Sequence, residues 1–178
     1  MFYENILDLI GNTPIIKLNQ IFDDENIADI YVKLESFNLG GSIKDRAALS
    51  IIEQAEKDGS LKPGGTIIEP TSGNMGISLA IIGKIKGYKI IIVMPDTMSI
   101  ERRNILKALG AELILTDGAE SMKGAIEKAE TLASRHRKYF MPQQYCHLAN
   151  TEASCRTTGQ ETLNGIPNLD VFITGVGS

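Results

Sequence analysis

The most constraining feature of this sequence is the run Lys-Ile-Ile-Ile-Val-Met at residues 89–94. A nearly continuous apolar run of this length is typical of a strand that is covered on both faces, as in parallel sheets. Strand-like and helix-like segments alternate around it, with strands at 66–69, 112–115, 139–141 and 171–174, and helices at 43–58, 75–85, 100–109, 119–136 and 151–163. Such alternation is typical of βαβ units with right-handed crossovers. It predicts an α/β fold in which helices lie on both faces of a parallel, twisted sheet.

The first part of the chain is less regular. Residues 2–10 favour a short amphipathic helix, which the Gly-Asn-Thr-Pro sequence at 11–14 would end. Apolar and polar residues alternate at 30–35, and residues 15–18 are strand-like as well. This pattern predicts two short strands separated by a polar loop at 19–28.

Composition excludes several classes of protein. The chain has 178 residues, a net charge of −4, no Trp and no basic run, so nucleic-acid binding is not expected. No apolar run reaches membrane-spanning length, and the N-terminus lacks the pattern of a signal peptide. The two cysteines, Cys146 and Cys155, lack the spacing of zinc ligands or of a redox pair. We therefore expect a cytoplasmic protein with reduced thiols, no metal site and no membrane contact.

One lysine lies in an unusual setting, within Gly-Gly-Ser-Ile-Lys-Asp-Arg at residues 40–46. Ser42 is a good N-cap, and Asp45 is where a capping-box partner would reach back. Lys44 is then in the first turn of a helix, where the positive end of the helix dipole disfavours an ammonium and favours the free amine. A free amine is what a Schiff-base lysine requires. The alternative is a solvated lysine beside a helix cap, since most lysines are exposed.

Two turns that follow predicted strands could bind anions, because ligands of parallel sheets lie at the carboxyl ends of strands. The first offers hydroxyls, an amide and backbone N–H groups at a helix start: Thr71, Ser72, Gly73 and Asn74. The second follows the strand predicted at 171–174 and is rich in glycine: Gly175, Val176, Gly177 and Ser178. Neither is decisive alone, because plain turns have the same composition and the second lacks a complete phosphate-binding fingerprint.

Further polar groups lie in the loop after the strand predicted at 139–141. The amide of Gln143 or Gln144 could donate to a carboxylate, although a solvated loop glutamine is the simpler interpretation. Cys146 and His147 are adjacent, and adjacent residues seldom form a nucleophile–base pair. Asp45 and Arg46 are most simply a cap and a surface charge.

Taken together, these segments resemble the cysteine synthase and cystathionine β-synthase family of fold-type II pyridoxal phosphate (PLP) enzymes. The matching motifs are Asn-Thr-Pro at 12–14, Gly-Gly-Ser-Ile-Lys-Asp-Arg at 40–46, Glu-Pro-Thr-Ser-Gly-Asn at 69–74, Met-Pro-Asp-Thr-Met-Ser-Ile-Glu-Arg-Arg at 94–103, Leu-Gly-Ala at 109–111, Gln-Tyr at 144–145, Arg-Thr-Thr-Gly at 156–159 and Thr-Gly-Val-Gly-Ser at 174–178. They run in order from about residue 5 to the last residue.

The resemblance implies a role for each matching residue. Lys44 would carry PLP as a Schiff base and remove the α-proton, and Asn74 would bind the ring hydroxyl of the cofactor. Gly177 and Ser178 would begin the phosphate loop. The substrate carboxylate would be held by Thr71, Ser72, Gly73 and Gln144, with Met75 beside them.

The resemblance also implies an organisation into two α/β domains, usually in a homodimer. Residues 1–44 would belong to the larger, cofactor domain, residues 45–145 would form the smaller domain with the substrate loop, and residues 146–178 would return to the larger domain. The last motif ends within the glycine-rich turn. The larger domain that the resemblance implies is then incomplete, and we expect the chain to be truncated.

Two local departures from the family pattern affect the expected substrate. The family usually has Thr at the position of Met75, and that hydroxyl contacts the substrate carboxylate. After the Gln-Tyr motif the family usually has Asn-Pro and a second Pro, whereas this chain has Cys146, His147, Leu148 and Thr151. A His near the mouth of the site could bind a ligand or move protons.

The implied reaction is β-replacement or β-elimination on an amino acid through an aminoacrylate intermediate. The leading hypothesis is cysteine synthesis from an O-activated serine and sulfide. An alternative uses cysteine itself, releases sulfide and yields lanthionine, cystathionine or serine. A hypothesis from another class is a non-catalytic fragment that folds, dimerises or binds a partner. A nucleotide-binding domain is disfavoured, because no complete dinucleotide fingerprint or P-loop is present.

Overall fold

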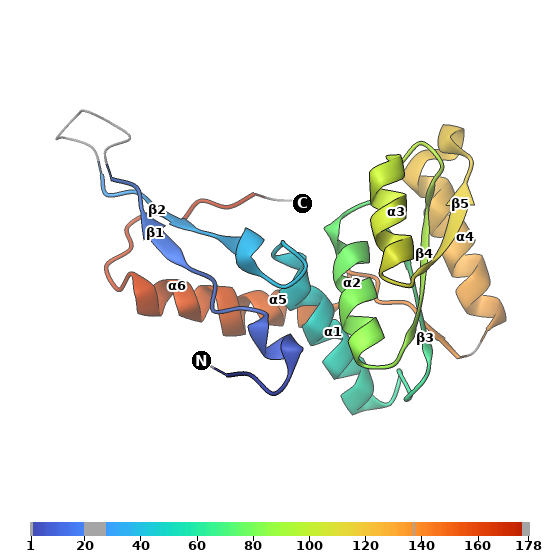
Figure 1. The fold of residues 1–178 in the computed structure, drawn as a ribbon, viewed down its shortest axis with the longest axis horizontal. Coiled ribbons are helices and arrows are strands. Elements are labelled where there is room, and N and C mark those ends of the chain that lie inside the picture. The colour runs from blue at the N-terminus through green and yellow to red at the C-terminus, as the bar shows by residue number, and fades with distance from the viewer. Residues whose placement is uncertain (1, 20–27, 137, 176–178) are drawn as a thin grey trace.

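The computed structural model describes residues 2–19, 28–136 and 138–175, which form an α/β structure (Figure 1). Its strands are β1 (Ile15–Lys17), β2 (Tyr31–Lys33), β3 (Thr66–Pro70), β4 (Lys89–Pro95), β5 (Glu112–Thr116) and β6 (Tyr139–Phe140). Its α-helices are α1 (Lys44–Asp58), α2 (Asn74–Ile85), α3 (Ile100–Ala108), α4 (Ser121–Arg135), α5 (Leu148–Ala153) and α6 (Gln160–Gly165). Shorter helical turns are η1 (Ile6–Leu9), η2 (Glu35–Phe37), η3 (Gly118–Glu120) and the π-helical η4 (Ser154–Gly159).

The predicted parallel sheet is confirmed. Its strand order is β5-β4-β3-β6 and every neighbouring pair is parallel. Alternate residues of β4 face two different cores, because Ile92 packs with residues of α1 and α2, whereas Val93 packs with Ala125 and Ala129 of α4. Helices therefore cover both faces of the sheet, which is why the sequence of β4 is apolar along nearly its whole length.

The N-terminal strands form a separate antiparallel pair, with Ile16 opposite Val32. This pair lies beside α6 and away from the four-stranded sheet (Figure 1). The helix predicted at 2–10 is only the short turn η1, and the strand predicted at 30–35 is limited to β2. Residues 20–27 of the predicted polar loop lie outside the described residues.

Two predictions for the C-terminal part need correction. The helix predicted at 151–163 is longer, since α5, η4 and α6 follow one another without interruption from residue 148 to residue 165. The strand predicted at 171–174 is wrong, because residues 171–175 form no strand. The side chains of Val171, Phe172 and Ile173 are exposed. An apolar, β-branched segment forms a strand only beside a hydrogen-bonding partner, and no described strand lies next to this one.

Arg46 is not the surface charge that its sequence context suggested, because only 4% of it is exposed. Its Nε lies 2.8 Å from Glu35 Oε2, and its Nη1 lies 2.5 Å from Glu161 Oε1. Lys33 Nζ approaches Glu161 Oε2 at 2.7 Å. Partial burial alone would raise the pKa of Glu161, but hydrogen bonds from Arg46 and Lys33 lower it to about 2. This network joins the start of α1 to η2, β2 and α6.

Replacing Arg46 with Ala should therefore destabilise the fold by about 3–5 kcal/mol, because two partly buried carboxylates lose their shared cation. Urea denaturation followed by circular dichroism measures the change. Arg156→Ala is the matched control, since Arg156 pairs with Glu152 one helical turn away at an exposed site. Its cost should stay below about 1 kcal/mol. Equal losses in the two variants would contradict a special role for the buried network.

Candidate active site

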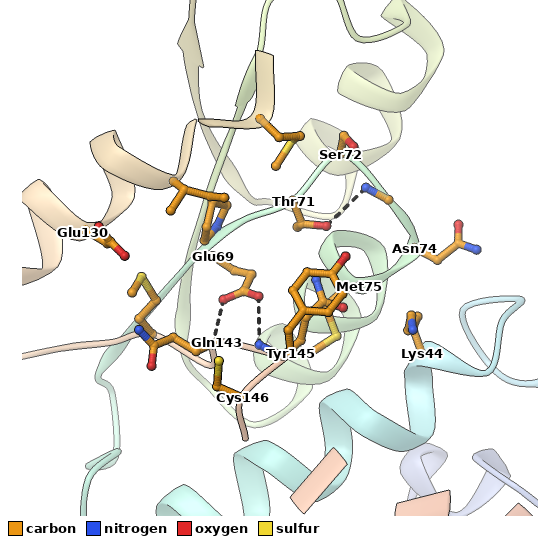
Figure 2. A pocket seen from close by; sticks show the side chains of 16 residues that line it. Lys44, Glu69, Thr71, Ser72, Asn74, Met75, Glu130, Gln143, Tyr145 and Cys146 are labelled. Carbon is orange, nitrogen blue, oxygen red and sulfur yellow. Dashed lines mark hydrogen bonds between the residues drawn. The ribbon is translucent and has the colours of Figure 1, made fainter. Parts of the chain in front are cut away.

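A cavity of about 390 Å³ opens where β3 ends, between the start of α1 and the middle of α4 (Figure 2). It brings together most of the residues singled out in the sequence, namely Lys44, Thr71, Ser72, Gly73, Asn74, Met75 and Gln144. Gly177 and Ser178, predicted to begin a phosphate loop, lie outside the described residues. Segments separated by up to 100 positions in the chain thus meet at one site.

Lys44 is the first residue of α1 and is half-buried. Its side chain has no hydrogen-bond or ion-pair partner among the described residues. It also borders a second cavity of about 240 Å³, which Thr174 and Gly175 line from the other end of the chain. The amine therefore lies between the Thr71–Asn74 side of the site and the first residue of the glycine-rich turn.

The local structure around Lys44 differs from the predicted capping box. The residue before α1 is Ile43, and no side chain caps the helix, although Ser42 Oγ accepts a hydrogen bond from the Lys44 N–H at 3.3 Å. Asp45 reaches elsewhere: its Oδ2 accepts from Gly40 N at 2.5 Å, and its Oδ1 accepts from Ser78 Oγ at 2.5 Å. Asp45 is therefore an internal anchor for the start of α1.

The Asp45–Ser78 contact links two elements of the site. Ser78 belongs to α2, and its Oγ also lies 3.0 Å from the carbonyl oxygen of Asn74. Burial raises the pKa of Asp45, and the hydrogen bonds from Ser78 and Gly40 offset only part of that effect. A carboxylate buried in this way fixes the helix that carries Lys44 relative to the helix that begins at Asn74.

The start of α2 offers free hydrogen-bond donors. Its N-cap is Gly73, so no side chain caps it, and Thr71 Oγ1 accepts from Gly73 N at 3.2 Å. The N–H groups in the first turn of an α-helix have no acceptor within the helix, and the helix dipole adds positive potential there. This turn, residues 71–74, can therefore receive a carboxylate or a phosphate at the cavity.

The opposite wall comes from the loop at residues 142–147 and from a carboxylate with no role predicted from the sequence. Glu69, at the end of β3, accepts hydrogen bonds from the backbone of Gln143 at 3.1 Å and of Gln144 at 3.4 Å (Figure 2). Burial raises its pKa to about 7. The sequence feature that could have indicated this role is an acidic residue directly after Ile67 and Ile68 in an apolar strand.

The remaining lining is mostly apolar. Met122 and Ile126 project from α4, Met141 follows β6, and Met75 contributes its thioether although it belongs to the core. Cys146 also lines the cavity. His147 is not among the lining residues: its Nδ1 accepts from Ala149 N at 3.3 Å and so caps α5. That contact assigns His147 a structural task at the helix start.

The described residues contain neither a cluster suited to a metal ion nor a helix suited to a membrane. No group of three or more His, Cys, Asp or Glu side chains is placed to hold a metal ion. In the same residues, no helix has the length and apolar character needed to cross a membrane.

Comparison with known sequences identifies the family. Residues 6–178 match the family described as "Pyridoxal-phosphate dependent enzyme". The chain belongs to this family. It is 55% identical over 177 residues to a cysteine synthase of Staphylococcus aureus, covering 98% of this chain and 56% of that protein. It is 51% identical over 178 residues to a probable cysteine synthase of Bacillus subtilis, covering 98% of this chain and 57% of that protein.

Solved structures agree with this assignment. A hydrogen sulfide-producing enzyme of Fusobacterium nucleatum superposes with a TM-score of 0.87 at 49% identity, covering 94% of this chain and 54% of that one. Isoform 3 of O-acetyl serine sulfhydrylase from Entamoeba histolytica gives a TM-score of 0.87 at 47% identity, and the match covers 94% of this chain and 51% of that one. The expected fold-type II PLP fold is thus confirmed, and the chain spans about half the length of these relatives.

The residues present fit the cofactor of the family. PLP requires an amine for its aldehyde, and Lys44 supplies one with no competing partner among the described residues. Its aromatic ring requires a largely apolar cavity with a few polar groups, as the Met side chains and the 71–74 turn provide. Asn74 is exposed at the cavity and adds an amide.

The contact between Asp45 and Ser78 can be tested by stability. Ser78→Ala should destabilise the fold by about 1–3 kcal/mol, because a buried carboxylate loses a hydrogen-bond donor. Urea denaturation measures the loss. Ser134→Ala, which removes an exposed hydroxyl in α4, should change stability by less than about 0.5 kcal/mol. In an Asp45→Asn background the cost of Ser78→Ala should shrink, and an undiminished cost there would contradict the assignment.

Proposed function

We propose that this chain carries the catalytic lysine and the substrate-binding turn of a PLP-dependent cysteine synthase, which converts an O-activated serine and sulfide to cysteine. One observation carries the proposal: the amine of Lys44, which has no partner among the described residues, lies on the cavity that the uncapped start of α2 also borders. An amine and a carboxylate-binding turn on one cavity are what a reaction at the α-carbon of an amino acid requires.

Each residue has a task in this proposal. Lys44 Nζ would hold the cofactor through its aldehyde carbon until the substrate amino group displaces it, and the freed amine would then remove the proton on the substrate Cα and later return it. Thr71, Ser72 and Gly73 bind the substrate carboxylate together with Gln144. Asn74 would hydrogen-bond the ring hydroxyl of PLP. When bound, PLP accepts the electron pair that the departing Cα proton leaves behind.

The proposed replacement reaction needs neither an oxidant nor a reductant. The Cβ–O bond of the substrate breaks and its acyl group leaves as the carboxylate, while sulfide forms the new Cβ–S bond. Lys44 moves one proton away from Cα and back to it. The apolar side chains of Met75, Met122 and Met141 limit water at the cavity, which favours sulfide over water as the nucleophile.

Three further parts of the proposal concern organisation. Residues 1–44 and 146–178 belong to a larger cofactor domain, and residues 45–145 to a smaller one; support comes from β1, β2 and α6, which lie together and away from the four-stranded sheet (Figure 1). Gly177 and Ser178 begin the phosphate loop. The protein is a cytoplasmic homodimer. Exposed apolar residues on β1 and β2 support the dimer, and the free thiols Cys146 and Cys155 support the cytoplasmic location.

Lys44→Ala should abolish covalent attachment of PLP. The protein is incubated with PLP and reduced with borohydride, and the labelled peptide is mapped by mass spectrometry. The unmodified sequence should carry the label on Lys44, and Lys57→Ala, an exposed lysine in the last turn of the same helix, should retain it. A label that persists in Lys44→Ala would contradict the assignment, and no label in any variant would favour a non-catalytic fragment.

A second candidate is sulfide release from cysteine. The observation that favours it is the structural match to a hydrogen sulfide-producing enzyme at 49% identity. The PLP-loaded protein is given O-acetylserine with sulfide, and in a separate reaction cysteine alone. Formation of cysteine in the first reaction supports the synthase, whereas release of sulfide only in the second supports the alternative.

A further inference from the structure

Glu69 is a carboxylate in an apolar setting, and the proposed reaction does not use it. It is 2% exposed, it follows Ile67 and Ile68 in β3, and it pairs across the sheet with Ile92 of β4. A buried carboxylate destabilises a fold unless hydrogen bonds compensate. Its hydrogen-bond partners in the described chain are two backbone N–H groups, those of Gln143 and Gln144.

These two bonds tie the 142–147 loop to the sheet. The other hydrogen bonds of the loop are local, because the N–H groups of Cys146 and His147 both donate to the carbonyl of Gln143. Asn150 Nδ2 donates to the carbonyl of Gln144 from the following helix. Among the described residues, Glu69 is therefore the polar contact between this loop and β3.

The backbone of the loop is held in a costly conformation at the same point. Gln143 has φ +49°, in the left-handed region that residues with a side chain seldom adopt. Such a conformation is unfavourable for a residue with a side chain and persists where surrounding contacts enforce it. The hydrogen bond from the Gln143 N–H to Glu69 is the contact that can enforce it here.

No cation of the described chain forms an ion pair with Glu69. The titratable side chains that line the same cavity are Lys44 on α1, Glu130 on α4, and Tyr145 and Cys146 on the loop itself, and none of them hydrogen-bonds to Glu69. Burial raises the pKa of Glu69 to about 7, since the two backbone hydrogen bonds offset only part of the desolvation. The carboxylate thus changes charge near neutral pH.

We propose that Glu69 is a positioning residue whose ionised carboxylate holds the 142–147 loop, and with it Gln144, against the 71–74 turn, and that neutralising this carboxylate releases the loop. The ionised group accepts one N–H on each oxygen. When it is protonated, one oxygen carries a hydrogen that faces an N–H group, and one of the two bonds is lost. Only the link to substrate binding rests on the proposed function, through the task of Gln144.

Amide hydrogen exchange, resolved by nuclear magnetic resonance, tests this without cofactor or substrate. Protection factors, which correct for the intrinsic pH dependence of exchange, are measured for Gln143 and Gln144 between pH 6 and 8.5. Protection should rise about tenfold over this range, the effect of one charge-assisted hydrogen bond. In Glu69→Gln it should be low and independent of pH. Glu69→Asp, which keeps the charge, should restore part of the pH dependence.

Glu130→Gln is the matched control, because Glu130 lines the same cavity but its side chain makes no hydrogen bond among the described residues. Its protection profile should follow that of the unmodified protein. Wild-type protection in Glu69→Gln would overturn the proposal, as would equal loss in the two variants. If Glu69→Gln also speeds exchange of the Ile91 and Ile92 amides in β4, Glu69 has a general structural role, and this result too would overturn the proposal. Failure of PLP to attach to Lys44 would leave these readings unchanged, so the two proposals fail separately.

Discussion

The parallel pairing of β3 with β4 is the constraint on which the rest of this structure depends. Its register sets Glu69 opposite Ile92 and Pro70 opposite Val93, so that both strands end at the same edge of the sheet. Because alternate residues of β4 face opposite cores, helices are required on both sides. Placing α2 directly after β3 then puts the 71–74 turn at that edge, and packing of α1 on α2 brings Lys44 to it.

The sequence predicts the central sheet well because its signals are local. Gly59, with φ +78°, ends α1 where expected, and Ser99 caps α3 through Arg102 N. Signals that require a distant partner mislead. The segment at 171–174 has strand-like residues but no described neighbour, and Arg46 is buried only because Glu35 and Glu161 arrive from segments 11 and 115 positions away.

The candidate site shows the same division. Lys44, the 71–74 turn and Gln144 could be predicted as one site through the motifs, and the cavity brings them together. Asp45 and Glu69 could not be assigned from the sequence, because a carboxylate becomes an internal anchor only when other elements cover it. Helix α2 supplies Ser78 to the first, and the 142–147 loop supplies two amides to the second.

Asp45 and Glu69 each fix one wall of the cavity relative to the 71–74 turn. Asp45 joins the start of α1 to α2 through Ser78, which also lies against Asn74, while Glu69 joins the 142–147 loop to the strand that leads into residue 71. Both have a raised pKa, because burial disfavours the ionised carboxyl relative to its hydrated form in the unfolded chain. While Glu69 stays buried, the N–H groups of Gln143 and Gln144 favour its ionised form, so ionisation tightens the loop although it lowers the global stability of the fold. For Glu69 this lowers stability progressively as the pH rises from 4.5 to about 7. Such costly buried charges are typical of sites where an exact placement of reacting groups matters more than stability. Here they set the amine of Lys44 and the donors of the 71–74 turn at fixed positions on one cavity.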